Sequence, residues 1–584
     1  MARAANGSRS AFVLVLGVTV LLLVCGARLV ALEVHDGSRL RERAQKQQIS
    51  HIPISAQRGD ILDTRGRIFA GSIRRPSIFA DPTLVRDVRF AAHTLAPVLG
   101  LDPRRLEQDI RDHAHRKFLW VKRLISGEEL EAFQRIRRSK GLRGFVVTYE
   151  PQRRYLAPSA RLASHVIGFV GADQHGLAGI ELSYEKHLGG TDGRRTATVD
   201  VHKRRIDTRS RDHIAPLDGA SVVLTIDVNI QERAELHLKA AVEQYQAEAG
   251  TAIVMDPRSG EVLAMANLPD YSPEDPIPDG LSETQRDAAR DHLLNRAVSG
   301  AYEPGSVFKP FVMSCAIQEG LTKFGERFEI NGPIRQFGRR PIRDTHTYGT
   351  LLLEEIISKS SNIGMGMLAD RCGNERLYEY VTRFGFGKAT GITLPNEHSG
   401  LLRPLDEWDS YSTQSIPIGQ EIAVTPLQLA NAFGVFCNGG ILYQPRVVRG
   451  IVAADGHVIE DRSQPIIVEP HVLTASLARD FRFEALVRTI NSGTGRKGAI
   501  DGYQVFGKTG TAQIARTDGR GYAPGRYQGT FVCGAPADDP RVVVLVSIFV
   551  PRGRSYYGGT VAAPTAAKIM ADTLSYLGVP RQTE

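Results

Sequence analysis

Cysteine is scarce in this chain, with five residues among 584, and no two of them form a C-x-x-C pair. Scattered cysteines without metal-ligand spacing argue against a zinc site and against a disulfide framework. We therefore expect no metal and no other cofactor. One cysteine lies in the N-terminal apolar run, and the other four are predicted to be buried free thiols: Cys315, Cys372, Cys437 and Cys533.

Repeats of fixed period, low-complexity tracts and blocks of like charge are also missing. The composition, 42% hydrophobic and 23% charged, is that of a folded protein, and 584 residues are too many for one core. The net charge of +9 has no nucleic-acid-binding signature beside it, so no nucleic acid is expected as a partner. A basic surface near anionic envelope polymers is the simpler reading.

The chain has one long hydrophobic run, residues 11–32, which is long enough for a spanning helix. Arg28 near its far end can extend its guanidinium to the interface. A cleaved signal peptide would have a shorter apolar core and a small-x-small cleavage site, and the residues after Arg28 offer none. We predict an uncleaved, single-pass anchor. Arg3 and Arg9 place residues 1–10 in the cytoplasm and the rest of the chain outside the inner membrane.

Residues 33–215 are rich in arginine and short of long apolar helices. Residues 58–72 predict two strands joined by a tight turn at 64–66, and residues 86–140 predict a helical stretch. Nothing in this half carries catalytic chemistry. We expect an elongated pedestal domain, of the dimerisation type, that lifts the second half off the membrane.

The character of the chain changes near Pro216. Two β-rich runs are joined by a turn at 256–260, a helical region spans about 280–440, and three strands and a tail helix follow. This order predicts an α+β domain, residues 216–578, with one antiparallel sheet flanked by helices on both faces. Residues 579–584 would form a C-terminal tail.

The stretch EPGSVFKP places Ser306 three residues before Lys309, directly after a Pro-Gly pair. Helical spacing continues to Gly320, so both side chains should lie on one face of a helix, one turn apart. The amine can then reach the serine Oγ, and the helix N-terminus favours negative charge there. The lysine must be neutral part of the time, which burial and a nearby cation can arrange.

This spacing alone is weak evidence, because S-x-x-K recurs at residues 183–186, where a solvated helix face is expected. After the copy at Ser306, two further motifs follow in order. These are the S-x-N of Ser360 and Asn362 and the K-T-G of Lys508, Thr509 and Gly510, with Thr511 next. The three motifs are predicted to lie on a helix, a helix–helix turn and a strand. Together they are strong evidence for an active site, although each alone is weak.

The motif set resembles that of penicillin-binding proteins and β-lactamases. Over nearly its whole length the chain resembles the class B penicillin-binding proteins of the septal, cell-division type. The resemblance rests on RGDILDTRGRIFA, RRYL, HVIGFVG, GLAGIELSYE, DPRSGEVLAMANLPDYSP, NRAVSGAYEPGSVFKP, SKSSNIG, VTPLQLANAF, GKTGTAQ and YYGGTVAAP. It implies a D,D-transpeptidase that cross-links peptidoglycan stem peptides ending in D-Ala-D-Ala and that β-lactams acylate.

The resemblance also implies a role for each motif residue. Ser306 would attack the penultimate D-Ala carbonyl, and Lys309 would be its base. Ser360 would relay a proton to the leaving nitrogen, while Asn362 would hold Lys309 and the substrate amide.

The third motif would bind the substrate. Lys508 would add positive charge, and the hydroxyls of Thr509 and Thr511, on either side of Gly510, would suit the terminal carboxylate. Backbone N–H groups of Ser306 and Thr511 would form the oxyanion hole.

Three positions depart from the family pattern. Glu421, in IPIGQEIAVTPLQLA, stands where the family commonly has a second glycine, in a loop that lies close to the site in relatives. In the pedestal motif Thr64 replaces the usual arginine, and Arg65 replaces asparagine or serine. We expect Glu421 to affect the local shape of the site and the fit of antibiotics.

Rival functions predict features that the sequence does not have. A class A β-lactamase would carry an E-x-x-x-N stretch between the second and third motifs, and residues 363–507 have none. A β-lactam sensor would need a cytoplasmic signalling domain. A scaffold would be expected to have lost the nucleophile or one of the two lysines. A sporulation- or elongation-specific transpeptidase, or a non-catalytic divisome scaffold, stays as the alternative.

Partners follow from the resemblance as well. No glycosyltransferase domain precedes the pedestal, so glycan polymerisation would need a lipid II polymerase of the shape, elongation, division and sporulation family. Other division proteins and the lipid II-derived glycan complete the expected set.

Overall fold

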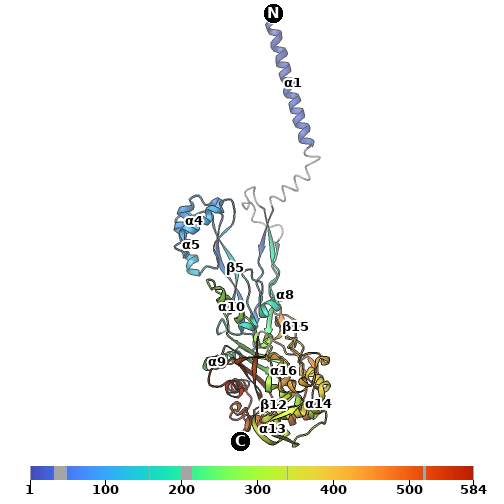
Figure 1. Cartoon of the computed structure of the whole chain (residues 1–584). Coiled ribbons are helices and arrows are strands. Elements are labelled where there is room, and N and C mark those ends of the chain that lie inside the picture. Colours follow the sequence, from blue (N-terminus) through green and yellow to red (C-terminus); the bar gives the residue numbers. More distant parts are fainter. Residues whose placement is uncertain are drawn as a thin grey trace. The chain divides into compact units, whose positions relative to one another are not determined.

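A computed structural model describes residues 2–31, 49–156, 158–198, 213–338, 340–516 and 521–582. The chain divides into two units, Met1–Ala56 with Gly190–Asp218, and Gln57–Gly189 with Gly219–Glu584 (Figure 1). Parts of the predicted pedestal and of the C-terminal tail lie outside the described residues. The domain boundaries at 33, 216 and 579 stay predictions.

The first unit contains α1 (Ala2–Ala31) and a small antiparallel sheet in the order β1-β6-β7. Its strands are β1 (Ile49–Ile54), β6 (Gly193–Thr198) and β7 (His213–Ile214). Within the described ranges, one helix is long and apolar enough to cross a membrane, over Ala11–Ala31 with a mean hydropathy of 2.6. This segment fits a single-pass membrane anchor.

The second unit begins with a seven-stranded sheet. Along it lie β15 (Val458–Asp461), β14 (Val448–Val452), β8 (Ser221–Leu224), β2 (Ile61–Leu62), β3 (Ile68–Ala80) and β4 (Leu119–Lys122), and β5 (Phe145–Tyr155) pairs with β3. Strands β2 and β8 run parallel, and the other pairs are antiparallel. Three of these strands come from beyond residue 215, so the sheet draws on both halves of the sequence.

The predicted turn at residues 64–66 is confirmed between β2 and β3. The Asp63 carboxylate accepts hydrogen bonds from the backbone N–H groups of Arg65 and Arg67, at 2.9 and 2.8 Å. The two departures from the family pattern have partners here. Thr64 Oγ1 accepts a 3.0 Å hydrogen bond from Arg449, and Arg65 forms a 3.0 Å ion pair with Asp227.

The predicted helical stretch at 86–140 is only partly correct. It contains α3 (Val88–Leu95), α4 (Pro103–Asp112) and α5 (Gly127–Ser139), each begun by an Asp or Ser N-cap. Strand β4 interrupts them because residues 119–122 pair with β3, a long-range contact that helical spacing cannot reveal.

A buried ion cluster joins β5 to α7 (Gly179–Ser183). Glu181 accepts hydrogen bonds from Arg58 Nε and Arg153 Nε, both at 2.6 Å, and all three side chains are at most 3% exposed. The family-type stretches RGD, RRYL and GIELSYE therefore meet at one point. The neighbouring S-x-x-K has exposed Ser183 and Lys186, as expected for a solvated helix face.

The predicted antiparallel sheet is confirmed as five strands in the order β10-β9-β19-β18-β17. The strands are β10 (Glu261–Leu268), β9 (Ala249–Asp256), β19 (Val542–Phe549), β18 (Tyr522–Ala535) and β17 (Phe506–Ala515). Residues of β19 alternate between two cores, with Val543 and Leu545 on one face and Val544 and Val546 on the other.

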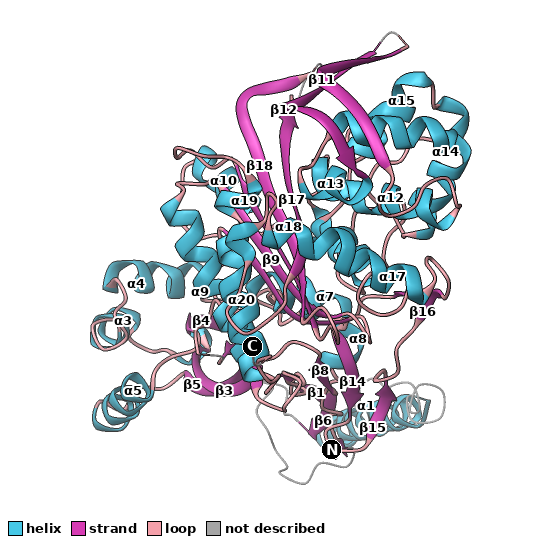
Figure 2. Ribbon diagram, turned by 90° about the horizontal axis from the view of Figure 1, so that it is seen from below, coloured by secondary structure: helices cyan, strands magenta, loops and turns pink. Residues whose placement is uncertain are grey.

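Helices cover both faces of this sheet. α9 (Val228–Gln244) and α20 (Ala563–Tyr576) pack on one face, and α12 (Lys309–Gln318) and α16 (Pro426–Gly434) on the other. Figure 2 shows α9 and α20 on one side of β9 and the group containing α12, α13 and α14 on the other. The remaining helices of eight or more residues are α10 (Glu283–His292) and α14 (Asn362–Arg383).

A β-hairpin corrects the prediction of helix across 280–440. β11 (Arg327–Phe337) and β12 (Arg340–Leu352) pair with each other, and α13 (Leu353–Ser358) follows directly. Phe328 and Ile330 alternate with exposed residues at the start of β11, but most of the remaining residues of both strands are exposed, so the alternation is too short to mark the hairpin in the sequence. It places β12 beside the start of α14.

Candidate active site

Ser306 lies in a tight turn. A 3-10 helix, residues Gly305–Phe308, precedes α12, so Lys309 opens the α-helix and Pro310 falls in its first turn. A proline is well accommodated there, because N–H groups of the first turn lack intrahelical partners. The turn packs directly on β17: a Cβ added to Gly510 would lie 2.9 Å from Val307 Cγ1 and 3.0 Å from Pro304 O.

Lys309 is fully buried and points to the second motif. Its Nζ donates to Ser360 O at 2.6 Å, Ser360 Oγ at 3.2 Å and Asn362 Oδ1 at 2.7 Å. Burial lowers the pKa of this amine to about 7, against a smaller opposite effect of Asp344. No hydrogen bond joins it to Ser306 in the described part of the chain. Such contacts often tighten only when substrate binds.

Lys508 reaches the same hydroxyl from β17. Its Nζ donates to Ser360 Oγ at 3.1 Å and to Thr509 O at 3.0 Å. Burial, and secondly the charge of Lys309, hold the pKa of Lys508 well below its ordinary value. Ser360 therefore bridges the two lysines, and it does so from a left-handed backbone with φ of 60°. The structure brings the three motifs together.

The two threonine hydroxyls of the third motif are held by neighbours. Thr509 Oγ1 lies 2.7 Å from Thr494 Oγ1, and Thr511 Oγ1 accepts from Gly558 N at 3.2 Å. Strand β17 forms one edge of the five-stranded sheet. An edge strand offers free backbone groups to which an extended peptide can pair.

Asp344, on β12, is a site residue that the sequence analysis missed. Its carboxylate accepts from Ser361 Oγ at 2.6 Å and from the N–H groups of Asn362 and Ile363, in the first turn of α14, whose N-cap is Ser361. The adjacent Arg343 O accepts from the Asn362 side chain at 2.9 Å. A single aspartate 17 residues before Ser361 gives no local signal, and only the hairpin reveals its place.

Asp344→Ala is expected to lower the rate of covalent labelling by penicillin about tenfold, because Asn362 loses its charged support. The pH midpoint of labelling should also fall below that of the unaltered protein, since Asp344 raises the pKa of Lys309. Labelling rates at several pH values would measure both effects.

Asp87→Ala is the matched control, because Asp87 caps α3 through Phe90 N at 2.9 Å. Each variant should lose about 1 kcal/mol of stability with the hydrogen bonds that its aspartate accepts at a helix N-terminus, but only the first should change labelling. Equal labelling by the two variants would contradict a positioning role for Asp344.

The cysteines agree with the sequence analysis. The four predicted thiols, Cys315, Cys372, Cys437 and Cys533, are free and buried, and Cys25 in α1 is exposed.

Two family descriptions match the chain. Residues 250–571 match the penicillin binding protein transpeptidase domain, and residues 53–224 match the penicillin-binding protein dimerisation domain. Together they span both the motif-bearing domain and the region before it.

Relatives match nearly end to end. The probable peptidoglycan D,D-transpeptidase PenA of Neisseria meningitidis is 34% identical over 98% of this chain and 94% of its own length. The stage V sporulation protein D of Bacillus subtilis is 32% identical over 99% of this chain and 87% of its own length. The crystal structure of penicillin binding protein 3 of Mycobacterium tuberculosis complexed with aztreonam superposes with a TM-score of 0.69. It is 27% identical and covers 91% of this chain and 98% of that one.

Proposed function

The chain belongs to the class B penicillin-binding proteins and is a peptidoglycan D,D-transpeptidase, and from this premise we propose that Ser306 carries its acyl-enzyme with Lys309 as the base. The observation that carries the proposal is the buried Lys309 amine, whose pKa is lowered to about 7 and which contacts both residues of the S-x-N motif. A partly neutral amine one turn from a serine is what this chemistry needs.

The reaction begins when Ser306 Oγ attacks the penultimate D-Ala carbonyl and its proton passes to Lys309 Nζ. The C–N bond breaks, and the proton reaches the leaving D-Ala nitrogen through the Ser360 hydroxyl. Its hydrogen bonds to both lysines, at 3.2 and 3.1 Å, support this relay. An amine of a second stem then attacks the ester carbonyl, the C–O bond to Ser306 breaks, and the amine proton passes to Ser306 Oγ, which leaves a new amide bond as the cross-link.

Substrate binding uses the edge of β17. The stem peptide would lie along this strand, with its terminal carboxylate at Lys508, Thr509 and Thr511. The N–H groups of Ser306 and Thr511 would hold the oxyanion, supported by the close packing of the Ser306 turn on Gly510. A β-lactam would acylate the same serine, and the similarity to a protein solved with aztreonam supports this.

The test is labelling of the full chain in detergent with a fluorescent penicillin, followed by peptide mass spectrometry. We expect one stable adduct, on Ser306, and none in Ser306→Ala. Rapid release of free penicilloate would instead identify a β-lactamase. A folded protein without an adduct would favour a non-catalytic scaffold.

We place this cross-linking in the septal wall, on the likeness of the motif stretches to the septal type. The similarity to a stage V sporulation protein favours sporulation as the second candidate. A fluorescent fusion at the native locus separates them. Accumulation at midcell in every dividing cell supports the septal role, and expression confined to sporulating cells supports the other.

Orientation and partners complete the proposal. Arg3 and Arg9 before the apolar segment favour a cytoplasmic N-terminus and an extracytoplasmic catalytic domain. The anchor and the pedestal would contact a lipid II polymerase of the shape, elongation, division and sporulation family, together with other division proteins.

A further inference from the structure

The Ser306 turn contacts a second turn, which ends at Glu421. We call the hydrogen bonds and backbone contact between these two turns the clasp. Gly305 N donates to Gly419 O at 3.0 Å, and Glu421 N donates to Glu303 Oε1, also at 3.0 Å. A Cβ on Gly419 would overlap the backbone of Gly305, so the two turns are in backbone contact. A shift of the second turn therefore moves the first.

Glu421 adopts a left-handed backbone, with φ of 61°, which is unfavourable for any residue with a side chain. Its carboxylate offsets this cost through several contacts. It accepts hydrogen bonds from Arg403 Nη2 at 2.6 Å, from Ser412 Oγ at 3.0 Å and from Ser415 Oγ, and Arg340 Nη1 lies 3.6 Å away. Hydrogen bonds and ion pairs therefore reach both oxygens of the Glu421 carboxylate.

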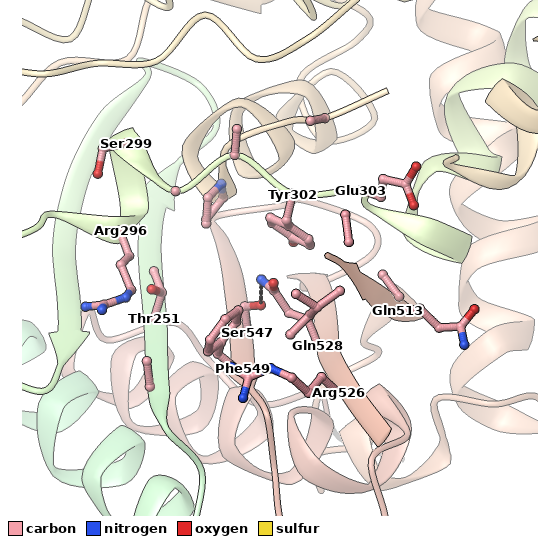
Figure 3. Close-up of a pocket in the computed structure, with 18 of the residues that line it drawn as sticks. Thr251, Arg296, Ser299, Tyr302, Glu303, Gln513, Arg526, Gln528, Ser547 and Phe549 are labelled. Atoms are coloured by element: carbon pink, nitrogen blue, oxygen red, sulfur yellow. Dashed lines mark hydrogen bonds between the residues drawn. The ribbon is translucent and has the colours of Figure 1, made fainter. Parts of the chain in front are cut away.

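The segment that leads into the Ser306 turn borders a cavity. Tyr302, Glu303 and Glu421 line a cavity of about 810 Å³ over the end of the central sheet. Figure 3 shows Tyr302 and Glu303 on the segment that borders this cavity, with Gln528 and Ser547 on the strands below. The Ser306 turn itself packs on β17, so contact with the Glu421 turn restrains the segment just before it, which the cavity leaves open on one side.

We propose that Glu421 is a positioning residue for acylation. Its carboxylate fixes the left-handed turn, and its backbone N–H fixes Glu303, three residues before the nucleophile. The proposal rests on Ser306 as the nucleophile. Because the carboxylate site proposed above lies on β17 and not on the Glu421 turn, loss of the clasp should slow the acylation step and leave initial ligand affinity nearly unchanged.

The test uses Glu421→Gly and Glu421→Gln in the full-length protein. Glycine suits the backbone but removes every carboxylate contact, whereas glutamine keeps the length and one acceptor oxygen. Stopped-flow labelling with a fluorescent penicillin separates the dissociation constant of the first complex from the rate constant of acylation. We expect Glu421→Gly to lower that rate constant about tenfold, with the dissociation constant within about twofold, and Glu421→Gln to recover part of the loss.

Glu326→Gln is the matched control. Glu326 accepts from Thr322 at 2.6 Å and from Arg371 at 2.8 Å, and its side chain is 30% exposed against 31% for Glu421. This variant should lower the melting temperature comparably and leave the acylation rate constant unchanged. The inference is overturned if Glu421→Gly acylates within twofold of the unaltered protein, or if the control slows acylation equally. An unaltered protein without a Ser306 adduct would overturn the proposed function instead.

Discussion

Replacing Lys309 with methionine is expected to slow acylation of Ser306 by penicillin about a thousandfold, the usual scale for a lost general base. Methionine fills the fully buried site without a charge, so the protein should remain folded. Labelling rates, with circular dichroism as the check on folding, would measure this. Lys497→Met, at an exposed position, should label at the unaltered rate.

The pH profile identifies the reason for the loss. In the unaltered protein the labelling rate should rise with pH through about 7, because the amine acts only when neutral and its pKa is about 7. Lys309→Met should lack this rise. A variant that keeps the unaltered rate and profile would remove Lys309 from the mechanism.

The same lysine affects stability. Its pKa in the folded protein, about 7, lies below the ordinary 10.5, so between these values the unfolded chain binds more protons. Lys309 therefore increases the free energy of unfolding as pH rises from 7 to 10.5. In Lys309→Met the free energy of unfolding should increase less over this pH range.

Glu181→Ala is expected to cost about 3–5 kcal/mol of stability, the largest loss that we predict for a single side chain. Its carboxylate is the shared partner of the two buried arginines, Arg58 and Arg153, each at 2.6 Å. Its removal takes the counter-charge from the buried Arg153 and leaves Arg58 with the part-exposed Glu185. Urea unfolding followed by circular dichroism would measure the loss.

Glu185→Ala provides the comparison. Glu185 also pairs with Arg58, at 2.7 Å, but its side chain is 29% exposed. Water can replace it, so the expected loss is about 1 kcal/mol or less. Equal losses in the two variants would show that burial of the cluster does not matter.

Local patterns predicted the parts of this molecule that depend on neighbours in sequence. The turn at 256–260 and the strand pair before α20 were predicted correctly, because each depends on residues within about twenty positions of one another. The β11–β12 hairpin was missed, since its exposed strands pair only with each other. Asp344 could not be found without that hairpin.

Long-range electrostatics were equally invisible in the sequence. Arg58 and Glu181 are 123 positions apart, and both belong to stretches that resemblance alone had marked. Periodicity reports which face is buried, but it does not report which buried charges meet. The motif spacings predicted which residues form the candidate site, and the fold was needed to show that Ser360 joins the two lysines.

The contact between Gly510 and the Ser306 turn also limits how drug resistance can evolve. Any side chain at position 510 would collide with Val307 and Pro304, so substitution there would disturb the nucleophile itself. Mutations that lower β-lactam susceptibility while preserving wall synthesis are therefore not expected at position 510.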